Sequence, residues 1–296
     1  MMKTAERPKL LLPLLILLLA VAVLAIWIIT GGKEEFDPHK GQVYIYDGFD
    51  WIWMTPLEGV EPNPMTQEDF SLAGTAPVYL GSLFQTRRCI DVSEHQYGID
   101  WQQVKASGVD GAFIRIGRRG YTEGGLFNDP WYQPNMDGAL AAGMEVGVYF
   151  FSQAVSVQEA LEEADFVLER LQGYRVTLPV VYDWEKIPGE ASARTNGLSM
   201  TTRTDCAVAF CEKIKAAGYT PGVYFNRNLG YYGYDLTRLT DYFLWFALPE
   251  SPWPSFYYAM DMWQYSFTEA VPGVEGETDM NLLFIPVATP SPEPTT

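Results

Sequence analysis

Two carboxyl groups stand two residues apart in the segment Asp183-Trp184-Glu185. Val180 and Val181 precede them and indicate a buried strand, on which side chains point the same way at every second residue. Asp183 and Glu185 are therefore expected on one side of a sheet, with Cα atoms about 6–7 Å apart at the usual strand rise. Like charges at that separation raise the pKa of one partner. The pair then offers a protonated acid beside an ionised one, which is the combination that cleaves glycosidic bonds.

Other polar residues stand near the ends of further apolar segments. An isolated Asp-x-Glu is more often a solvated strand end, so these additional residues matter for the interpretation. Asp91 is either a site residue or a cap for the next helix, a role that Ser93 would also fill. Arg115 lies inside an apolar segment, where an unpaired charge is costly, and we expect it to pair with a carboxylate. The candidate polar residues near predicted strand ends are Asp91, Tyr149, Asp183, Asn226, Asp261, Gln264 and Asp279.

An alternation of strand and helix must position these residues. The apolar runs are nearly continuous, as expected for strands that are covered on both faces. Gly108, Gly143 and Gly218 follow predicted helices and are suited to cap their C-termini. The predicted strands are 89–93, 111–116, 145–151, 178–183, 222–226, 242–247, 260–266 and 279–284, and the predicted helices are 100–107, 131–142, 156–171 and 201–217.

Eight strands in this order predict an α/β fold, a closed TIM-like barrel in which the helices fade over the last third. Functional residues of such a barrel gather at the C-terminal ends of its strands, which is where the paired acids fall. An open doubly wound sheet is the alternative. It is weakened because no glycine-rich phosphate-binding fingerprint follows the first strand.

Composition and charge narrow the function classes. The chain has 296 residues and a net charge of −17, which argues against nucleic acid as a partner because phosphates require Lys and Arg. The two histidines, His39 and His95, do not suffice for a histidine-built metal site, and neither a metal nor a cofactor is expected. The cysteines, which form no CxxC pattern, are interpreted as buried free thiols: Cys89, Cys206 and Cys211.

The N-terminal region carries a charge-free apolar stretch at residues 10–30, about one bilayer thick at the helical rise. Basic residues precede it, so the positive-inside rule leaves the N-terminus in the cytoplasm and exports the rest. A cleaved signal peptide is the alternative, disfavoured by the length of the stretch and by the lack of a clean cleavage site. The predicted organisation is a cytoplasmic stub at 1–9, a transmembrane helix at 10–30, a juxtamembrane linker with short strands at 31–85, a barrel at 86–288 and a disordered tail at 289–296.

The linker at 31–85 contains aromatic residues at alternating positions. This spacing predicts a short strand or hairpin that packs on the main domain, and a small sugar-binding patch is the functional alternative. The aromatic residues are Tyr44, Tyr46, Phe49, Trp51 and Trp53.

Taken together, the motifs resemble family 25 glycoside hydrolases, the lysozyme-type N-acetylmuramidases, over roughly residues 89–284. The resemblance rests on six groups of motifs in the right order. They are DVSEHQ (91–96) with IDW (99–101), FIRIG (113–117) with GYTEG (120–124), DP (129–130) with Asn135, GVYFFSQA (147–154), LPVVYDWE (178–185), and MWQY (262–265) with GETDMN (276–281).

The resemblance implies a barrel of five βα units closed by three further strands. It implies hydrolysis of the β-1,4 bond between N-acetylmuramic acid and N-acetylglucosamine in peptidoglycan, with Glu185 as the proton donor. Asp183 would assist, either by holding the acetamido group of the substrate or by helping a water. Asp91 and Asp279 would be supporting acids, and Tyr149 and Trp263 would line the groove. From their place near strand ends, Gln264 and Asn226 are further candidates to bind the substrate or support the site.

One departure from the family pattern stands at Ala247-Leu248-Pro249, where the family usually continues with an Ala-x-Tyr type sequence. It puts one wall of the sugar groove in doubt. Retention through substrate assistance and inversion both stay open, although close carboxyl groups favour retention. A chitinase-like enzyme of family 18 is an alternative, weakened because Val181 and Pro179 stand where further Asp residues are usual. A non-catalytic wall-binding module is another.

Overall fold

A closed barrel forms the centre of the protein, for which the computed structural model describes residues 15–22 and 37–287. The barrel belongs to a compact unit made of Tyr44–Ile52 and Pro56–Thr296. Its strands form a nine-stranded sheet in the order β5-β13-β12-β11-β10-β9-β8-β6-β7, which closes by pairing of β5 with β6. Because β7 (Leu126–Asn128) only extends the edge of β6, eight strands make the barrel. They are β5 (Phe84–Val92), β6 (Gly111–Arg119), β8 (Glu145–Ser152), β9 (Val180–Trp184), β10 (Pro221–Asn226), β11 (Phe243–Ala247), β12 (Met262–Glu269) and β13 (Thr278–Pro286).

Adjacent barrel strands are parallel, except that β13 runs antiparallel to both of its neighbours. The eight-stranded barrel predicted from the sequence is therefore confirmed. The antiparallel direction of β13 has a consequence for the site. The N-terminal end of β13 lies at the same mouth as the C-terminal ends of the other strands, which brings Asp279 opposite Asp91.

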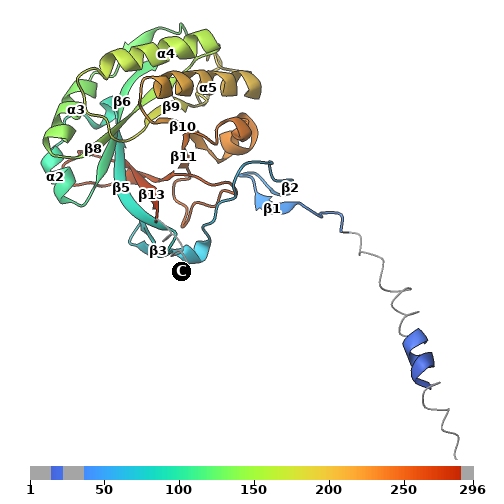
Figure 1. Cartoon of the computed structure of the whole chain (residues 1–296). Coiled ribbons are helices and arrows are strands. Elements are labelled where there is room, and N and C mark those ends of the chain that lie inside the picture. Colours follow the sequence, from blue (N-terminus) through green and yellow to red (C-terminus); the bar gives the residue numbers. More distant parts are fainter. Residues whose placement is uncertain (1–14, 23–36, 288–296) are drawn as a thin grey trace, which may run out of the picture. The chain divides into compact units, whose positions relative to one another are not determined.

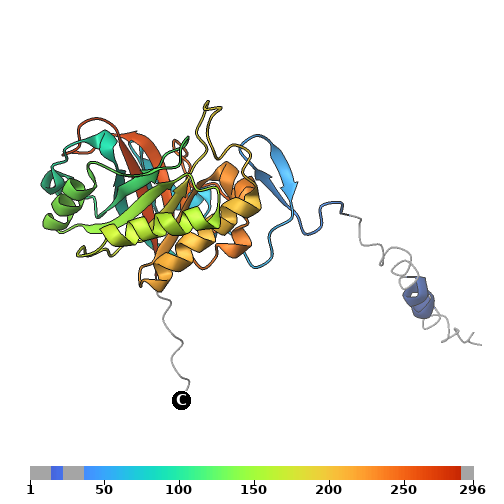
Figure 2. The ribbon, with the colours of Figure 1, turned by 90° about the horizontal axis from the view of Figure 1, so that it is seen from above.

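Helices cover one side of the barrel, as Figures 1 and 2 show. Side-chain caps start three of them, from Asp100, Ser156 and Ser199. The glycines predicted as C-caps have positive φ angles, 86° at Gly108 and 90° at Gly218, which side chains other than glycine rarely adopt. The α-helices of the barrel are α2 (Trp101–Ala106), α3 (Tyr132–Ala141), α4 (Val157–Arg170) and α5 (Met200–Ala216).

The strands after β10 are connected without α-helices. A π-helical turn, η3 (Leu229–Gly233), and a 3-10 turn, η4 (Leu236–Arg238), follow β10. The hairpin of β3 (Phe70–Ala73) and β4 (Ala76–Tyr79) covers β12 and β13 instead. The ring of Phe70 lies 5.8 Å from that of Trp263 and 6.3 Å from that of Phe284. An N-terminal hairpin thus supplies the apolar cover that helices supply elsewhere.

A second small hairpin consists of β1 (Val43–Tyr46) and β2 (Trp51–Met54). Two more 3-10 turns complete the described elements, η1 (Gln67–Asp69) and η2 (Glu94–Gln96). The smaller compact unit, Met1–Val43 with Trp53–Thr55, contains a stacked pair, His39 and Trp53, with ring centroids 4.0 Å apart.

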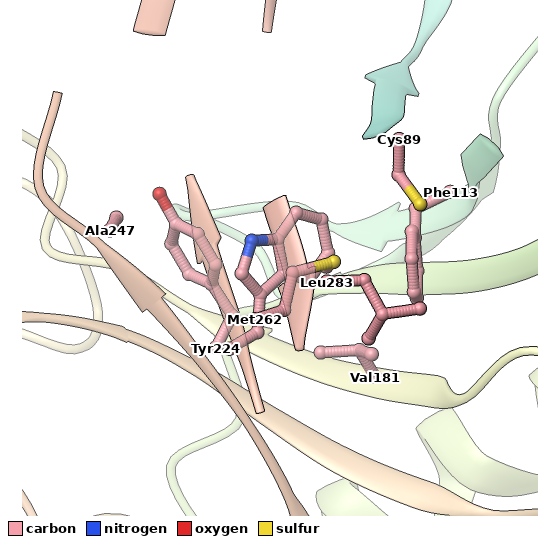
Figure 3. Packing of buried hydrophobic residues seen from close by; sticks show 8 residues of the cluster. Cys89, Phe113, Val181, Tyr224, Ala247, Met262 and Leu283 are labelled. Atoms are coloured by element: carbon pink, nitrogen blue, oxygen red, sulfur yellow. The ribbon is translucent and has the colours of Figure 1, made fainter. Parts of the chain in front are cut away.

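The interior of the barrel is filled by one layer of apolar side chains, shown in Figure 3. Seven of the eight strands contribute a member of this cluster, and Tyr149 of β8 packs against it. Such a layer makes the barrel a packed core rather than a channel. Its members are Cys89, Phe113, Val181, Tyr224, Trp245, Ala247, Met262 and Leu283.

Two sequence predictions concern the cysteines and the N-terminus. Cys89, Cys206 and Cys211 are buried and free, as predicted. Of the membrane-spanning stretch predicted at 10–30, residues 15–22 are described and are helical. The rest of that stretch, the stub at 1–9 and the tail at 289–296 lie outside the described residues. Among the described residues, no helix has the length and apolarity needed to cross a membrane.

Candidate active site

A polar layer lies directly above the apolar layer of the barrel. Since side chains on a strand alternate between faces, the residue two positions beyond each core residue also points inward. Asp183 follows Val181 in this way, and Gln264 follows Met262. All eight strands contribute to a pocket of about 300 Å³ above this layer, here called the active-site pocket. It is lined by Asp91, Ser93, His95, Gln96, Arg115, Tyr149, Phe151, Asp183, Glu185, Tyr224, Trp245, Gln264 and Asp279.

Asp183 and Glu185 both line the active-site pocket, as the strand spacing predicts. Asp183 is 5% exposed, and its Oδ1 is buried with no hydrogen-bond partner among the described residues. Burial, then the charges of Glu185 and Asp91, raise the pKa of Asp183 well above its usual value. Burial, then the charge of Asp91, raise the pKa of Glu185 to about 7. The pair therefore retains a proton at neutral pH, which a general acid requires.

Asp91 is held as a hydrogen-bond acceptor at the floor of the pocket. Its Oδ2 accepts bonds from Asn281 Nδ2 at 2.7 Å and from Gln264 Nε2 at 2.9 Å. These donors favour the charged form, while burial is the larger effect and raises the pKa of Asp91 to about 6. Burial raises the pKa of Asp279 to about 9, and the charge of Asp91 adds to this effect. The protonated carboxyl group of Asp279 also donates a hydrogen bond to Asp91. Asp91 therefore loses its proton at a lower pH than Asp279 does.

Two aromatic side chains orient the amides that bind Asp91. Tyr224 donates its hydroxyl to Gln264 Oε1 at 2.7 Å. Trp245 donates Nε1 to Asn281 Oδ1 at 2.8 Å. With their oxygens engaged, both amides turn their N–H groups toward the carboxylate. The direction of every bond in this network thus favours a negative charge at Asp91.

Glu185 stands just past the end of β9, where its backbone is fixed by the loop that follows β8. Gln153, fully buried, donates Nε2 to the carbonyl oxygen of Glu185 at 2.9 Å and accepts a bond from Thr195 Oγ1 at 2.9 Å. The neighbouring Ser152 donates to buried Glu163 at 2.6 Å, which pairs with Arg119 at 2.7 Å. The backbone of Glu185 is therefore held by Gln153, which is itself fixed by buried polar contacts.

Arg115 pairs with carboxylates, as predicted. Its Nε lies 2.7 Å from buried Asp129, and its Nη2 lies 2.7 Å from Glu94. Removing one member of such a buried pair costs about 3–5 kcal/mol because the other charge is left unpaired. Arg115 also lines the active-site pocket, and its positive charge lowers the pKa of Asp183, although less than burial raises it.

Three residues singled out in the sequence lie elsewhere. Trp263 does not line the active-site pocket, because it precedes Gln264 on the strand and therefore points to the opposite face. Its buried ring packs against Phe70, and its Nε1 donates to the carbonyl oxygen of Leu248 at 3.0 Å. Asn226 lines a neighbouring pocket with Glu185 and accepts a bond from Leu229 N at 3.0 Å. Asp261 lies at the opposite end of the barrel, where it accepts a bond from Leu244 N at 2.7 Å.

Three members of the polar network were not singled out in the sequence: Tyr224, Trp245 and Asn281. The signal that identifies two of them is the period of two along each strand. Asn281 stands two residues after Asp279, and Tyr224 stands two before Asn226. Tyr224 and Asn281 therefore each share a strand face with a residue that the sequence analysis had selected, whereas no selected site residue stands two positions from Trp245.

Comparisons with known proteins agree with this fold and site. The model of "Glycosyl hydrolases family 25" matches residues 90–274. Lysozyme M1 of Streptomyces globisporus is 29% identical over 201 residues, which are 65% of this chain and 66% of that protein. A bacterial lysozyme structure from Streptomyces coelicolor is 27% identical with a TM-score of 0.53, and the match covers 66% of this chain and 90% of that one. The modular autolysin LytC of Streptococcus pneumoniae, solved with a synthetic peptidoglycan ligand, is 26% identical with a TM-score of 0.55, covering 67% of this chain and 46% of that one.

The similarity extends over only part of the length of these relatives. The chain spans slightly less than two thirds of Lysozyme M1 and less than half of LytC. The family model nevertheless matches more than half of this chain, and the matched residues include Asp91, Asp183 and Gln264. Val181, at a position where family 18 usually carries a further acid, lies in the apolar layer, which weakens the family 18 alternative. The chain belongs to glycosyl hydrolase family 25.

Proposed function

We propose that the protein hydrolyses the β-1,4 bonds between N-acetylmuramic acid and N-acetylglucosamine in bacterial peptidoglycan. The observation that carries this proposal is the active-site pocket itself, in which Glu185, with a pKa of about 7, lies among the buried carboxyl groups of Asp91 and Asp183 and the half-buried one of Asp279. Lysozyme M1 and the LytC complex with a peptidoglycan ligand support the choice of substrate.

In the proposed mechanism, Glu185 donates its proton to the oxygen of the leaving sugar. Positive charge then develops on the sugar ring, which has oxocarbenium character in the transition state. The negative charge that remains on the pair of Asp183 and Glu185 faces this positive charge, either directly or through the acetamido group of the substrate. Because Asp183 is buried beside Glu185, that charge acts in a lower dielectric than bulk water and stabilises the transition state more than it would in solution.

Asp91 and Asp279 support the pair without transferring a proton to the substrate. The ionised Asp91 raises the pKa of Glu185, so that the acid retains its proton near neutral pH. Asp279 retains its own proton through its hydrogen bond to Asp91. The two strands that carry them, β5 and β13, pair directly at this position.

The pH dependence of the hydrolysis tests the role of Glu185. A general acid is active when protonated, and its pKa is about 7, so we expect the rate of reducing-end release from purified peptidoglycan to fall as the pH rises above about 7. Asp91→Asn removes a charge that raises this pKa. The alkaline limb of its profile is therefore expected at lower pH than in the unsubstituted protein.

If the alkaline limb of the pH–rate profile lies at the same pH in Asp91→Asn as in the unsubstituted protein, the ionisation of Glu185 does not determine that limb. The Asp165→Asn variant is a matched control, because the side chain of Asp165 on α4 is 65% exposed and its charge is screened from the pocket. The same assay distinguishes the enzyme from a wall-binding module. A folded protein that binds peptidoglycan and releases no reducing ends would contradict the proposed hydrolysis.

We also propose that residues 10–30 anchor the protein in the cell membrane as a single span, with the barrel outside the cell. The length of the apolar stretch and the basic residues before it support this arrangement. We expect the protein in the membrane fraction of its cells, with its N-terminus intact by sequencing. A mature protein that is released and begins after about residue 25, as signal cleavage would produce, would overturn the anchor.

A further inference from the structure

A second pocket lies at the mouth of the barrel and is larger than the active-site pocket. Its volume is about 650 Å³, within the range of roughly 300–1,000 Å³ that is typical of ligand sites. We call it the aromatic pocket. Residues that line it include Tyr44, Tyr46, Trp51, Arg227, Trp253 and Tyr257.

One wall of the aromatic pocket comes from the hairpin of β1 and β2. Tyr44 and Trp51 are 54% and 57% exposed, and their rings are stacked with centroids 5.4 Å apart. Tyr46 lies beside them, with its ring centroid 5.7 Å from that of Trp51. Large aromatic side chains that gather at a surface mark interaction sites. These residues stand before residue 90, where the family match begins.

The tip of this hairpin is fastened to the barrel. Asp47 accepts bonds from the backbone N–H groups of Phe49 and Asp50 at 2.7 and 2.8 Å, which shapes the turn. Its second carboxylate oxygen accepts a hydrogen bond from Tyr232, on the turn after β10. The guanidinium carbon of Arg227 lies 5.4 Å from the ring centroid of Tyr46. The aromatic wall is thus held in place.

The opposite wall is formed by Arg227, which follows β10, and by the connection between β11 and β12, and it supplies polar groups. Arg227 donates to the carbonyl and hydroxyl oxygens of Ser255 at 3.0 and 2.6 Å, while its Nε is buried with no hydrogen-bond partner among the described residues. Glu250 lines the pocket with a φ angle of 58°, a strained conformation of the kind that clusters at binding sites. Leu248, which also lines it, belongs to the segment where the sequence departs from the family pattern.

A sequence of neighbouring pockets links the aromatic pocket to the active site. Glu185 lines both the active-site pocket and the pocket of Asn226 and Tyr232. Arg227 and Tyr231, the chain neighbours of those two residues, line the aromatic pocket. The pocket of Asn226 and Tyr232 therefore adjoins the active-site pocket at Glu185, and the aromatic pocket is lined by the chain neighbours of two of its residues.

We propose that the aromatic pocket is a second carbohydrate-binding site, which holds a part of the glycan strand away from the bond that is cut. The choice of a glycan rests on the proposed function. The C–H faces of a pyranose ring carry slight positive charge and suit the negative faces of Tyr44 and Trp51. Its hydroxyl and amide groups suit the polar side chains of the opposite wall, from Arg227 and Glu250. A lipid surface would require a convex apolar face, whereas this site is concave and partly polar.

The experiment uses the full chain with Glu185→Gln, so that bound strands are not cut, and measures binding of long, peptide-free glycan strands by calorimetry. Tyr44→Ala with Trp51→Ala is expected to weaken binding about tenfold or more, the loss typical of aromatic residues central to an interface. Trp253→Ala tests the opposite wall independently of the hairpin and is expected to weaken binding as well. Trp51→Phe keeps an aromatic face and is expected to restore most of the affinity. Phe267→Ala, at a residue 43% exposed on β12, is the matched control and is expected to bind normally.

A second measurement separates this proposal from the proposed function. With Glu185 intact, the hairpin variants are expected to cut tetrasaccharides normally and long strands more slowly. If the protein with Glu185 intact cuts no strand, the proposed function is wrong. The binding of long strands by the Glu185→Gln variants still tests the aromatic pocket in that case. Unchanged binding of long strands in both the hairpin and the Trp253 variants would overturn the second site. Quenching of tryptophan fluorescence by brominated lipid in vesicles that carry the full chain, if it is lost in Trp51→Phe, would also overturn it, by assigning the hairpin to the membrane surface.

Discussion

Glu185→Gln is expected to lower the rate of peptidoglycan hydrolysis by about 1,000-fold, within the range that general acid catalysis contributes. Glutamine has nearly the same shape and retains the backbone contact in which Gln153 donates to the carbonyl oxygen of residue 185. It has no proton to give to the leaving oxygen. Because the loss is in proton transfer, binding of the glycan should change far less than the rate.

The measurement is the initial rate of reducing-end release, with thermal unfolding as the check on folding. Glu169→Gln is the matched control, since the side chain of Glu169 is 75% exposed on α4 and lies outside the active-site pocket. A Glu185→Gln protein that keeps its activity to within about tenfold, far less than a general acid contributes, would remove Glu185 from the role of proton donor.

Asp183→Asn is expected to lower the rate by about 100-fold or more, the usual effect of losing one group that stabilises charge in the transition state. Asparagine cannot carry the negative charge that the pair presents to the sugar ring. Since Asp183 is 5% exposed and its Oδ1 has no partner within the described residues, the substitution breaks no buried ion pair. The loss should therefore appear in the rate and not in the stability of the fold.

Thermal unfolding and the binding of tetrasaccharide in the Glu185→Gln background, compared with and without Asp183→Asn, separate these effects. If Asp183→Asn left the rate unchanged, Asp183 would be a packing residue of the barrel. If it abolished tetrasaccharide binding in proportion to the rate, Asp183 would hold the substrate equally in the ground state and in the transition state.

The period of two along a strand explains which site residues were predictable. It placed Asp183 and Glu185 together, and it also identifies Tyr224 and Asn281, which lie on the same faces as Asn226 and Asp279. The same rule shows why Trp263 faces away from the pocket, since adjacent residues on a strand point to opposite sides. The resemblance to the family suggested Trp263 as a lining residue, and here the local geometry of the strand is the better guide.

Other features depend on contacts that are distant in the sequence. Asp261 and Asp279 both stand at the start of a strand, so the sequence alone does not show which of them lies in the site. Because β13 pairs antiparallel with β5, the start of β13 and Asp279 lie at the active-site end of the barrel. The packing of Phe70 on Trp263 and Phe284 joins segments about 200 residues apart. The alternating aromatic residues predicted a hairpin at 44–53, but the pocket that they form requires Arg227 and the connection after β11.

The identity of the sugar at the new reducing end tests the central claim most directly. Purified peptidoglycan digested with the protein would be analysed by mass spectrometry, with the Glu185→Gln protein as the blank. We predict fragments that end in reducing N-acetylmuramic acid, at levels that fall to the blank when Glu185 is replaced. Fragments that end in reducing N-acetylglucosamine, or equal release by the Glu185→Gln protein, would contradict the assignment of a muramidase that acts through Glu185.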